Sequence, residues 1–244
     1  RPRCDWNEGA ARRRMTRREL MTVYRRLLRA LGPQGWWPAE TPFEVMVGAV
    51  LTQNTAWANV TRAILRLKEA GMMSPRRLAV VPLKDLAEWI RPSGYYNIKA
   101  ARLQALVRWF WGRARWEVAK LAEIPTDDLR RELLAVHGVG QETADSILLY
   151  ALGRPVFVVD AYTRRVLCRH GLVAPNAGYQ EIQAFFESRL QREERLFNEF
   201  HALLVALGNE VCRPAARCDA CPLRQYLEGR GFPAGAVDKA ARRA

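Results

Sequence analysis

No segment of the sequence is apolar for long enough to cross a membrane. The longest apolar stretch runs from Phe43 to Leu51 and contains Glu44, whereas a helix needs about 20 apolar residues to span a bilayer. No apolar segment follows the basic residues near the N-terminus, as it would in a secretory signal. We therefore expect a chain without a membrane partner, located in the cytoplasm and associated with the nucleoid.

Cysteine is also scarce, with five residues in 244. Disulfides are rare in the reducing cytoplasm, so these cysteines are expected to be reduced or bound to metal. Cys168, which directly follows Val166 and Leu167, has the surroundings of a core residue.

Acidic residues are too few to balance the basic ones. The chain has 25 Asp and Glu against 39 Lys and Arg, a formal net charge of +14. Cationic side chains neutralise phosphates and release their counterions, so the excess favours a nucleic acid partner. Part of it lies in residues 1–15 and 230–244, which we expect to be loose basic tails.

Patterns typical of strands are nearly absent. The one strand-like run, Val156 to Val159, has no candidate partner. The sequence predicts an all-α fold instead, because apolar residues recur at helical spacing along the chain, as at Leu129, Leu133 and Val136 and at Phe200, Leu203, Leu204 and Leu207.

A glycine-rich corner joins two of the expected helices. One helix ends near Val136, the next begins near Gln141, and His137-Gly138-Val139-Gly140 lies between them. Glycine reaches positive φ at little cost, and backbone N–H groups beside a helix N-terminus suit a DNA phosphate. Taken alone, the pattern is equally typical of any helix–helix corner.

Asp160 begins the next expected helix, directly after the apolar run Val156 to Val159. Asp is a favoured N-cap, and a carboxylate at this place can also face bound DNA. One residue can play both parts.

The hairpin, the apolar run and the aspartate together make residues 133–165 resemble the helix-hairpin-helix and catalytic aspartate of the endonuclease III superfamily of DNA glycosylases. The resemblance extends from about Trp36 to Cys221. It implies a two-domain fold with a central DNA-binding cleft and a monomer that binds double-stranded DNA containing a damaged base. A six-helix domain with the hairpin should span residues 43–152, and residues 16–42 plus 153–229 should form the second domain.

The resemblance also implies roles for single residues. Asp160 matches the catalytic aspartate. Residues 43–55 resemble the helix whose polar tip enters the minor groove, and residues 94–100 resemble the loop that wedges into the base stack. The expected DNA contacts are Gln53, Asn54, Tyr95, Lys99, Gly138, Val139, Gly140 and Arg164.

One position departs from the bifunctional members of the superfamily. They carry a lysine two residues after the second glycine of the hairpin, where this chain has Glu142. Lysine forms the Schiff base that leads to strand cleavage, and Glu cannot. The sequence therefore predicts a monofunctional glycosylase without AP-lyase activity.

Aromatic residues flank the helix that starts near Phe43. Taken singly, each Trp in an all-α protein is more typical of the core. Together with Glu142, however, they are similar to the bacterial 3-methyladenine DNA glycosylase III group. That resemblance implies a base pocket in which Trp37 and Trp57 sandwich an alkylated base, with Trp36 and Glu142 nearby. Such a base carries positive charge, and an indole face attracts a desolvated cation by ~1–2 kcal/mol.

The last motif consists of Cys212, Cys218 and Cys221. The family's iron–sulfur motif is C-x6-C-x2-C-x5-C, whereas here the first gap is one residue shorter and the fourth position is Leu227. The resemblance implies a [4Fe–4S] cluster with an unusual fourth ligand, for which Cys4 is a candidate. A degenerate site without metal and a zinc site are the alternatives.

The expected function is excision of alkylated purines, of the 3-methyladenine type, by hydrolysis of the N-glycosidic bond in base excision repair. A glycosylase for mismatched or oxidised bases and a catalytically inactive DNA-binding paralogue are the alternatives. The presence of Asp160 argues against the inactive paralogue.

Overall fold

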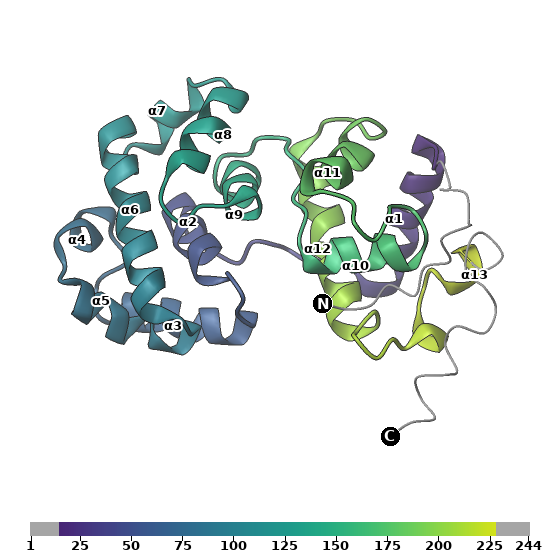
Figure 1. The fold of residues 1–244 in the computed structure, drawn as a ribbon, viewed down its shortest axis with the longest axis horizontal. Coiled ribbons are helices and arrows are strands. Elements are labelled where there is room, and N and C mark those ends of the chain that lie inside the picture. Colours follow the sequence, from purple (N-terminus) through teal and green to yellow (C-terminus); the bar gives the residue numbers. More distant parts are fainter. Residues whose placement is uncertain (1–14, 228–244) are drawn as a thin grey trace. The chain divides into compact units, whose positions relative to one another are not determined.

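The structure is a computed structural model that describes residues 15–227 (Figure 1). Every regular element in this part of the chain is a helix, which confirms the all-α prediction. Val156 to Val159 is buried but belongs to no sheet. Except for Met15, the expected basic tails lie outside the described residues. Within the described range, no helix is both long and apolar enough for a membrane span.

The chain divides into two compact units. We call Trp37–Arg154 the central unit, and Arg1–Trp36 together with Pro155–Ala244 the terminal unit. The two domains expected from the sequence, residues 43–152 and residues 16–42 plus 153–229, stay a prediction.

The central unit is built around a buried helix. Helix α2 (Pro42–Leu51) starts at Thr41, whose side chain accepts a hydrogen bond from the Glu44 N–H, with Pro at the first turn. Every residue from Phe43 to Leu51 is buried, because α3, α6, α9 and the π-helical turn η2 pack around α2. The other elements are α3 (Trp57–Glu69), α4 (Pro75–Val80), α5 (Leu83–Trp89), η1 (Arg91–Ser93), α6 (Tyr96–Ala114), α7 (Val118–Ala122), α8 (Thr126–Ala135), α9 (Gln141–Ser146) and η2 (Ile147–Ala151).

The six helices predicted for this region were too few. Three of its helices, α4, α5 and α7, have only five to seven residues each, and α9 is as short but continues into η2. A helix of that length presents fewer than two turns, so its apolar residues do not repeat often enough to give a helical pattern.

The terminal unit comprises α1 (Arg17–Leu31), α10 (Ala161–Arg169), α11 (Tyr179–Glu187), α12 (Glu194–Glu210), η3 (Cys218–Ala220) and α13 (Arg224–Leu227). Helix α12 packs against both α1 and α10. Its close approach to α10 depends on Gly208, where an added Cβ would lie 2.5 Å from the Tyr162 ring. The buried Arg165 guanidinium donates to the carbonyls of Gly208 and Cys212, which fixes α10 on the end of α12.

Candidate active site

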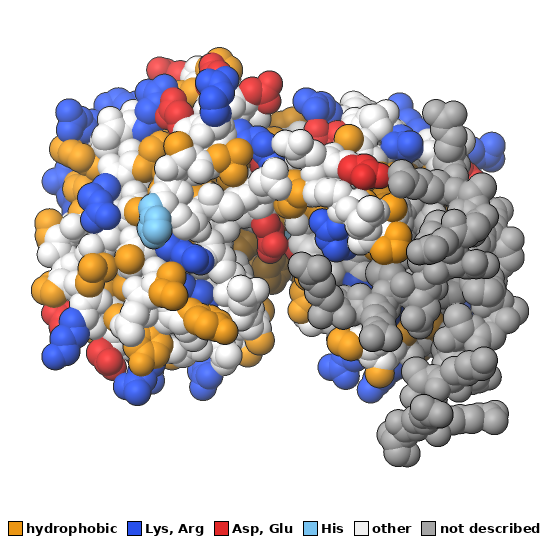
Figure 2. Space-filling model, in the orientation of Figure 1, with side chains coloured by type: hydrophobic (Ala, Val, Ile, Leu, Met, Phe, Trp, Pro, Cys, Tyr) orange, Lys and Arg blue, Asp and Glu red, His pale blue; other side chains and the backbone are white. Residues whose placement is uncertain are grey.

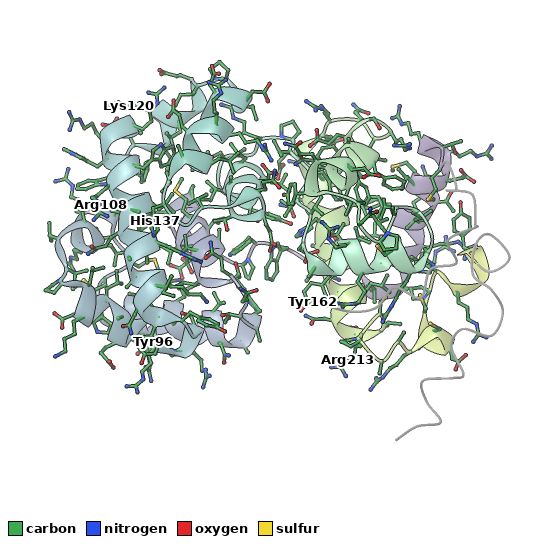
Figure 3. The ribbon with its side chains drawn as sticks, in the orientation of Figure 1. Tyr96, Arg108, Lys120, His137, Tyr162 and Arg213 are labelled. Carbon is green, nitrogen blue, oxygen red and sulfur yellow. The ribbon has the colours of Figure 1, made fainter. Side chains whose placement is uncertain are left out.

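The glycine-rich corner forms a tight hairpin between α8 and α9. Gly138 has φ 80°, and a Cβ there would lie 2.2 Å from Cγ of Arg102, so only glycine suits the position. A Cβ on Gly140 would meet nothing within 4 Å. The space beside Gly140 therefore lets another chain approach its backbone. His137 is exposed beside these glycines (Figure 3).

Gln53 holds the hairpin rather than pointing into solvent. Its Nε2 donates to the Gly138 carbonyl at 3.0 Å and to the Thr143 hydroxyl at 2.9 Å, and its Oε1 accepts from Arg102. The neighbouring Asn54 is exposed in a left-handed conformation, with φ 52°. Of the two candidates for the polar plug, the structure leaves Asn54 accessible.

Lys99 corrects a prediction. It was expected to help bind a phosphate, but it is 1% exposed. Its Nζ donates to the Leu51 carbonyl, the Thr55 hydroxyl and the Ser93 carbonyl at 2.6–2.8 Å. Burial, with the charge of Arg102 nearby, lowers the Lys99 pKa to about 8. Lys99 therefore ties the end of α2 to the turn before α6.

Arg164, the second residue expected to help bind a phosphate, is half-buried, and its guanidinium donates to the Ala177 carbonyl. This contact ties the start of α10 to the loop before α11.

Lys and Arg side chains are spread over the visible face of the central unit (Figure 2).

Tyr95 lies on the turn that Lys99 supports. It precedes α6 with φ 47° and is 69% exposed, and Gly94 before it has φ 66°. A left-handed conformation costs a residue other than glycine about 1–2 kcal/mol, and such strain collects at functional sites. The turn presents an aromatic ring to solvent on a rigid base.

Two of the predicted pocket tryptophans are in direct contact. The Trp37 and Trp57 ring centroids are 5.3 Å apart at an interplanar angle of 89°. A base sandwiched between parallel rings would need them roughly 7 Å apart, so the predicted sandwich is absent from this structure.

Both rings are half-buried, but their neighbours differ. Trp37 lies against Gly48, where a Cβ would be 2.9 Å from its Cζ2, and its ring centroid is 5.3 Å from that of Tyr150. Trp57 is the first residue of α3 and is half-buried. Trp36 belongs to the terminal unit. The aromatic cluster of the central unit therefore consists of Trp37, Trp57 and Tyr150, which was not predicted.

Glu142 lies exposed in the first turn of α9. No sequence pattern indicated the ion pair on the same helix, in which Arg130 binds both carboxylate oxygens of the fully buried Asp145 at 2.6 and 3.0 Å. This pair joins α8 to α9 and therefore supports both sides of the hairpin.

Asp160 is the N-cap of α10. Its Oδ1 accepts a hydrogen bond from the Thr163 N–H at 2.7 Å. Its Oδ2 is 3.9 Å from Nε2 of His201, which comes from the middle of α12. Both side chains are largely buried, and burial lowers the His201 pKa against the opposing effect of the Asp160 charge. The sequence motifs indicated Asp160 but not His201.

The three C-terminal cysteines lie in or next to η3, which Cys218 begins. Burial and the neighbouring thiols raise the pKa values of Cys218 and Cys221, and the Cys212 sulfur accepts a hydrogen bond from Arg169 at 3.3 Å. Within residues 15–227, no three or more His, Cys, Asp or Glu side chains are arranged to hold a metal. The candidate fourth ligand, Cys4, lies outside the described residues. The described residues alone therefore do not complete a cluster site.

An all-helical chain with a glycine hairpin and a buried, capping aspartate after an apolar run has the features of a helix-hairpin-helix DNA repair protein. The sequence profile described as "HhH-GPD superfamily base excision DNA repair protein" matches residues 47–192. The chain therefore belongs to this superfamily of base excision DNA glycosylases.

Comparisons with individual proteins also place the chain in this superfamily. A protein of Methanocaldococcus jannaschii that carries the provisional name of a DNA repair glycosylase is 46% identical over 207 residues, or 84% of this chain and 93% of that protein. The H. pylori 3-methyladenine DNA glycosylase bound to 1,N6-ethenoadenine superimposes with a TM-score of 0.68 at 29% identity, covering 80% of this chain and 98% of that one. A trapped endonuclease III–DNA covalent intermediate gives 0.74 at 26% identity, covering 86% and 94%.

Proposed function

We propose that the chain is a monofunctional DNA glycosylase that excises alkylated purines from double-stranded DNA. The observation that carries the proposal is the Trp37, Trp57 and Tyr150 cluster of the central unit. A base that stacks on the half-buried Trp57 would place its edge against the perpendicular Trp37 ring. Indole faces attract cations, so this corner favours a positively charged, N-alkylated purine over a neutral one. The neighbouring H. pylori structure, a 3-methyladenine glycosylase, supports the same class of base.

Asp160 supplies the charge for the reaction. The bond between C1′ of the sugar and the purine nitrogen breaks, and its electron pair leaves with the base, which becomes neutral. The sugar becomes an oxocarbenium ion, which the Asp160 carboxylate stabilises. Water then adds to C1′ and loses a proton. Because the leaving base already carries positive charge, no general acid is required.

The DNA contacts follow from the exposed groups of the central unit. The backbone at Gly140 would receive a phosphate. Tyr95 would enter the base stack and Asn54 would fill the space of the extruded base. Gln53, Lys99 and Arg102 would act indirectly, by holding the hairpin and the wedge in place.

A base-release assay tests this function. We expect the protein to release methylated purines from DNA treated with a methylating agent, as measured by chromatography. The abasic strand should stay intact, and borohydride should trap no covalent protein–DNA adduct, because Glu142 replaces the Schiff-base lysine. Release of thymine from a G·T mismatch or of an oxidised base, without methylated purines, would favour the alternative substrate class. Trapping comparable to that of a bifunctional enzyme would contradict the monofunctional assignment.

We also propose that the purified protein carries iron. Cys212, Cys218 and Cys221 would supply three ligands of a [4Fe–4S] cluster, and Cys4 would supply the fourth. Cysteine-ligated clusters are held by thiolates, so replacing one thiolate should weaken the site. No step of the reaction above uses the cluster.

The expected result is iron in protein prepared without oxygen, and loss of most of this iron in Cys4→Ser. Cys168→Ser is the matched control, because Cys168 is buried on α10 and its sulfur donates to the Ala174 carbonyl. Elemental analysis measures both. Equal iron in Cys4→Ser and the parent would remove Cys4 from the ligand set, and absence of iron from the parent would favour a site without a cluster.

A further inference from the structure

The two oxygens of the Asp160 carboxylate have different neighbours. Oδ1 is held by the Thr163 N–H at 2.7 Å, as in any capped helix. Oδ2 takes no part in the cap, and the imidazole of His201 lies 3.9 Å away. The cap thus fixes one oxygen, while the position of the other depends on what α12 places beside it.

His201 is an unusual side chain for its place in α12. Its neighbours Phe197, Phe200 and Leu204 are buried core residues, and its ring is perpendicular to that of Phe157, with centroids 6.5 Å apart. The side chain is 7% exposed. Packing alone would be served by an apolar residue, since a buried polar ring costs free energy unless its environment compensates.

We propose that His201 is a positioning residue for Asp160, which keeps a neutral polar group against Oδ2 and thereby preserves both the orientation and the negative charge of the carboxylate. This inference rests on the catalytic role proposed for Asp160. A neutral imidazole leaves the charge of the carboxylate undiminished, whereas an imidazolium would form an ion pair with it. Burial of His201 favours the neutral ring by lowering its pKa.

Two other ionisable groups that pack near α12 are engaged elsewhere. Tyr24 of α1 packs on Phe200, with ring centroids 5.4 Å apart, and Arg165 of α10 is bonded to the carbonyls of Gly208 and Cys212. Burial and the charges of Glu199 and Glu193 raise the Tyr24 pKa, so the Tyr24 hydroxyl stays neutral at physiological pH. The Asp160 carboxylate itself therefore reports on His201.

The test compares His201→Leu with His201→Gln in the full chain. The carbon-13 NMR signal of the Asp160 carboxyl, assigned by its loss in Asp160→Asn, is compared among these proteins at neutral pH. We expect the leucine variant to shift this signal, because an apolar side chain then lies against Oδ2. Glutamine keeps a neutral polar group there, so the signal should stay near that of the parent. His201→Val, which is smaller, takes the place of the leucine variant if that variant does not fold.

Kinetics give a second readout. Single-turnover release of methylated purines should fall roughly tenfold or more in His201→Leu, as is common when the partner of a functional group is lost, and should largely recover in His201→Gln. Binding to an abasic-site analogue should not change in either variant. An Asp160 carboxyl signal that is the same in the parent and both variants would overturn the inference. If the parent releases no methylated base, the proposed substrate class fails, and the carboxyl signal still decides the role of His201.

Discussion

Replacing Asp160 with asparagine is expected to lower the rate of base release by about 10³-fold or more, while binding to DNA survives. The amide has the shape of the carboxylate but lacks the charge that stabilises the oxocarbenium ion. Its oxygen can still accept the hydrogen bond from the Thr163 N–H, and Asn is as good an N-cap as Asp. The folded state should therefore be nearly unchanged.

Two further variants separate charge from capping. Asp160→Ala removes both, so it should be as inactive as Asp160→Asn and also less stable, by about 1 kcal/mol. Thr16→Ala removes the capping box of α1 in the same unit and should lower stability with normal activity of the folded protein. Release rates, melting temperatures and abasic-site binding measure these effects. Normal turnover by Asp160→Asn would reduce Asp160 to a helix cap.

The sequence carried enough information to predict the all-α fold, the hairpin and the capping aspartate, because these features depend on local rules. Gly138 requires positive φ, Asp160 occupies a position at which the backbone needs an acceptor, and α2 begins with Thr41 and Pro42. Each signal is contained in a few adjacent residues. Ser74 and Pro75 mark the start of α4 in the same way, but α4, α5 and α7 are each too short to give a measurable helical period.

Burial was harder to predict than helices. Lys99 lies one helical turn before Leu103 and shares its stripe with Leu106 and Phe110, all of which are buried. The same periodicity places His201 between Phe197 and Leu204. A charged or polar residue within an apolar stripe is thus a detectable sign of a buried polar role. Its partners come from distant segments, such as Leu51 and Ser93 for Lys99, and no local pattern identifies them.

The arrangement of the tryptophans could not be predicted for a related reason. Trp37 precedes α2 in the sequence and Trp57 follows it, but this order gives no information on the orientation of the two rings. Gly48 lets Trp37 approach α2 closely, and the Trp57 ring meets the Trp37 ring at 89°. The proposed pocket is therefore a corner between two perpendicular rings. A base that stacks on Trp57 cannot also stack on Trp37.

Replacing Trp57 with alanine is expected to lower excision of methylated purines by roughly 100-fold, since stacking of a base on an aromatic ring contributes ~1–3 kcal/mol and its positive charge adds to that. The fold should survive, because the ring is half-buried and begins α3 rather than filling a core. Loss of its contact with Trp37 should lower the melting temperature by no more than about 5 °C. Binding to an abasic-site analogue, which has no base to stack, should stay close to that of the parent.

A matched series shows whether stacking on a cation is the cause. Trp57→Phe keeps a flat ring but attracts cations less strongly than indole, so it should recover part of the activity, more for a neutral modified purine than for a methylated one. Trp111→Ala removes an exposed indole elsewhere in the central unit, one packed on Trp116, and should leave excision unchanged. A large fall in melting temperature with normal activity of the folded fraction would make Trp57 a packing residue. Equal losses for charged and neutral bases in every variant would leave Trp57 in the pocket but remove the preference for cations, and with it the main support for alkylated purines as the substrate.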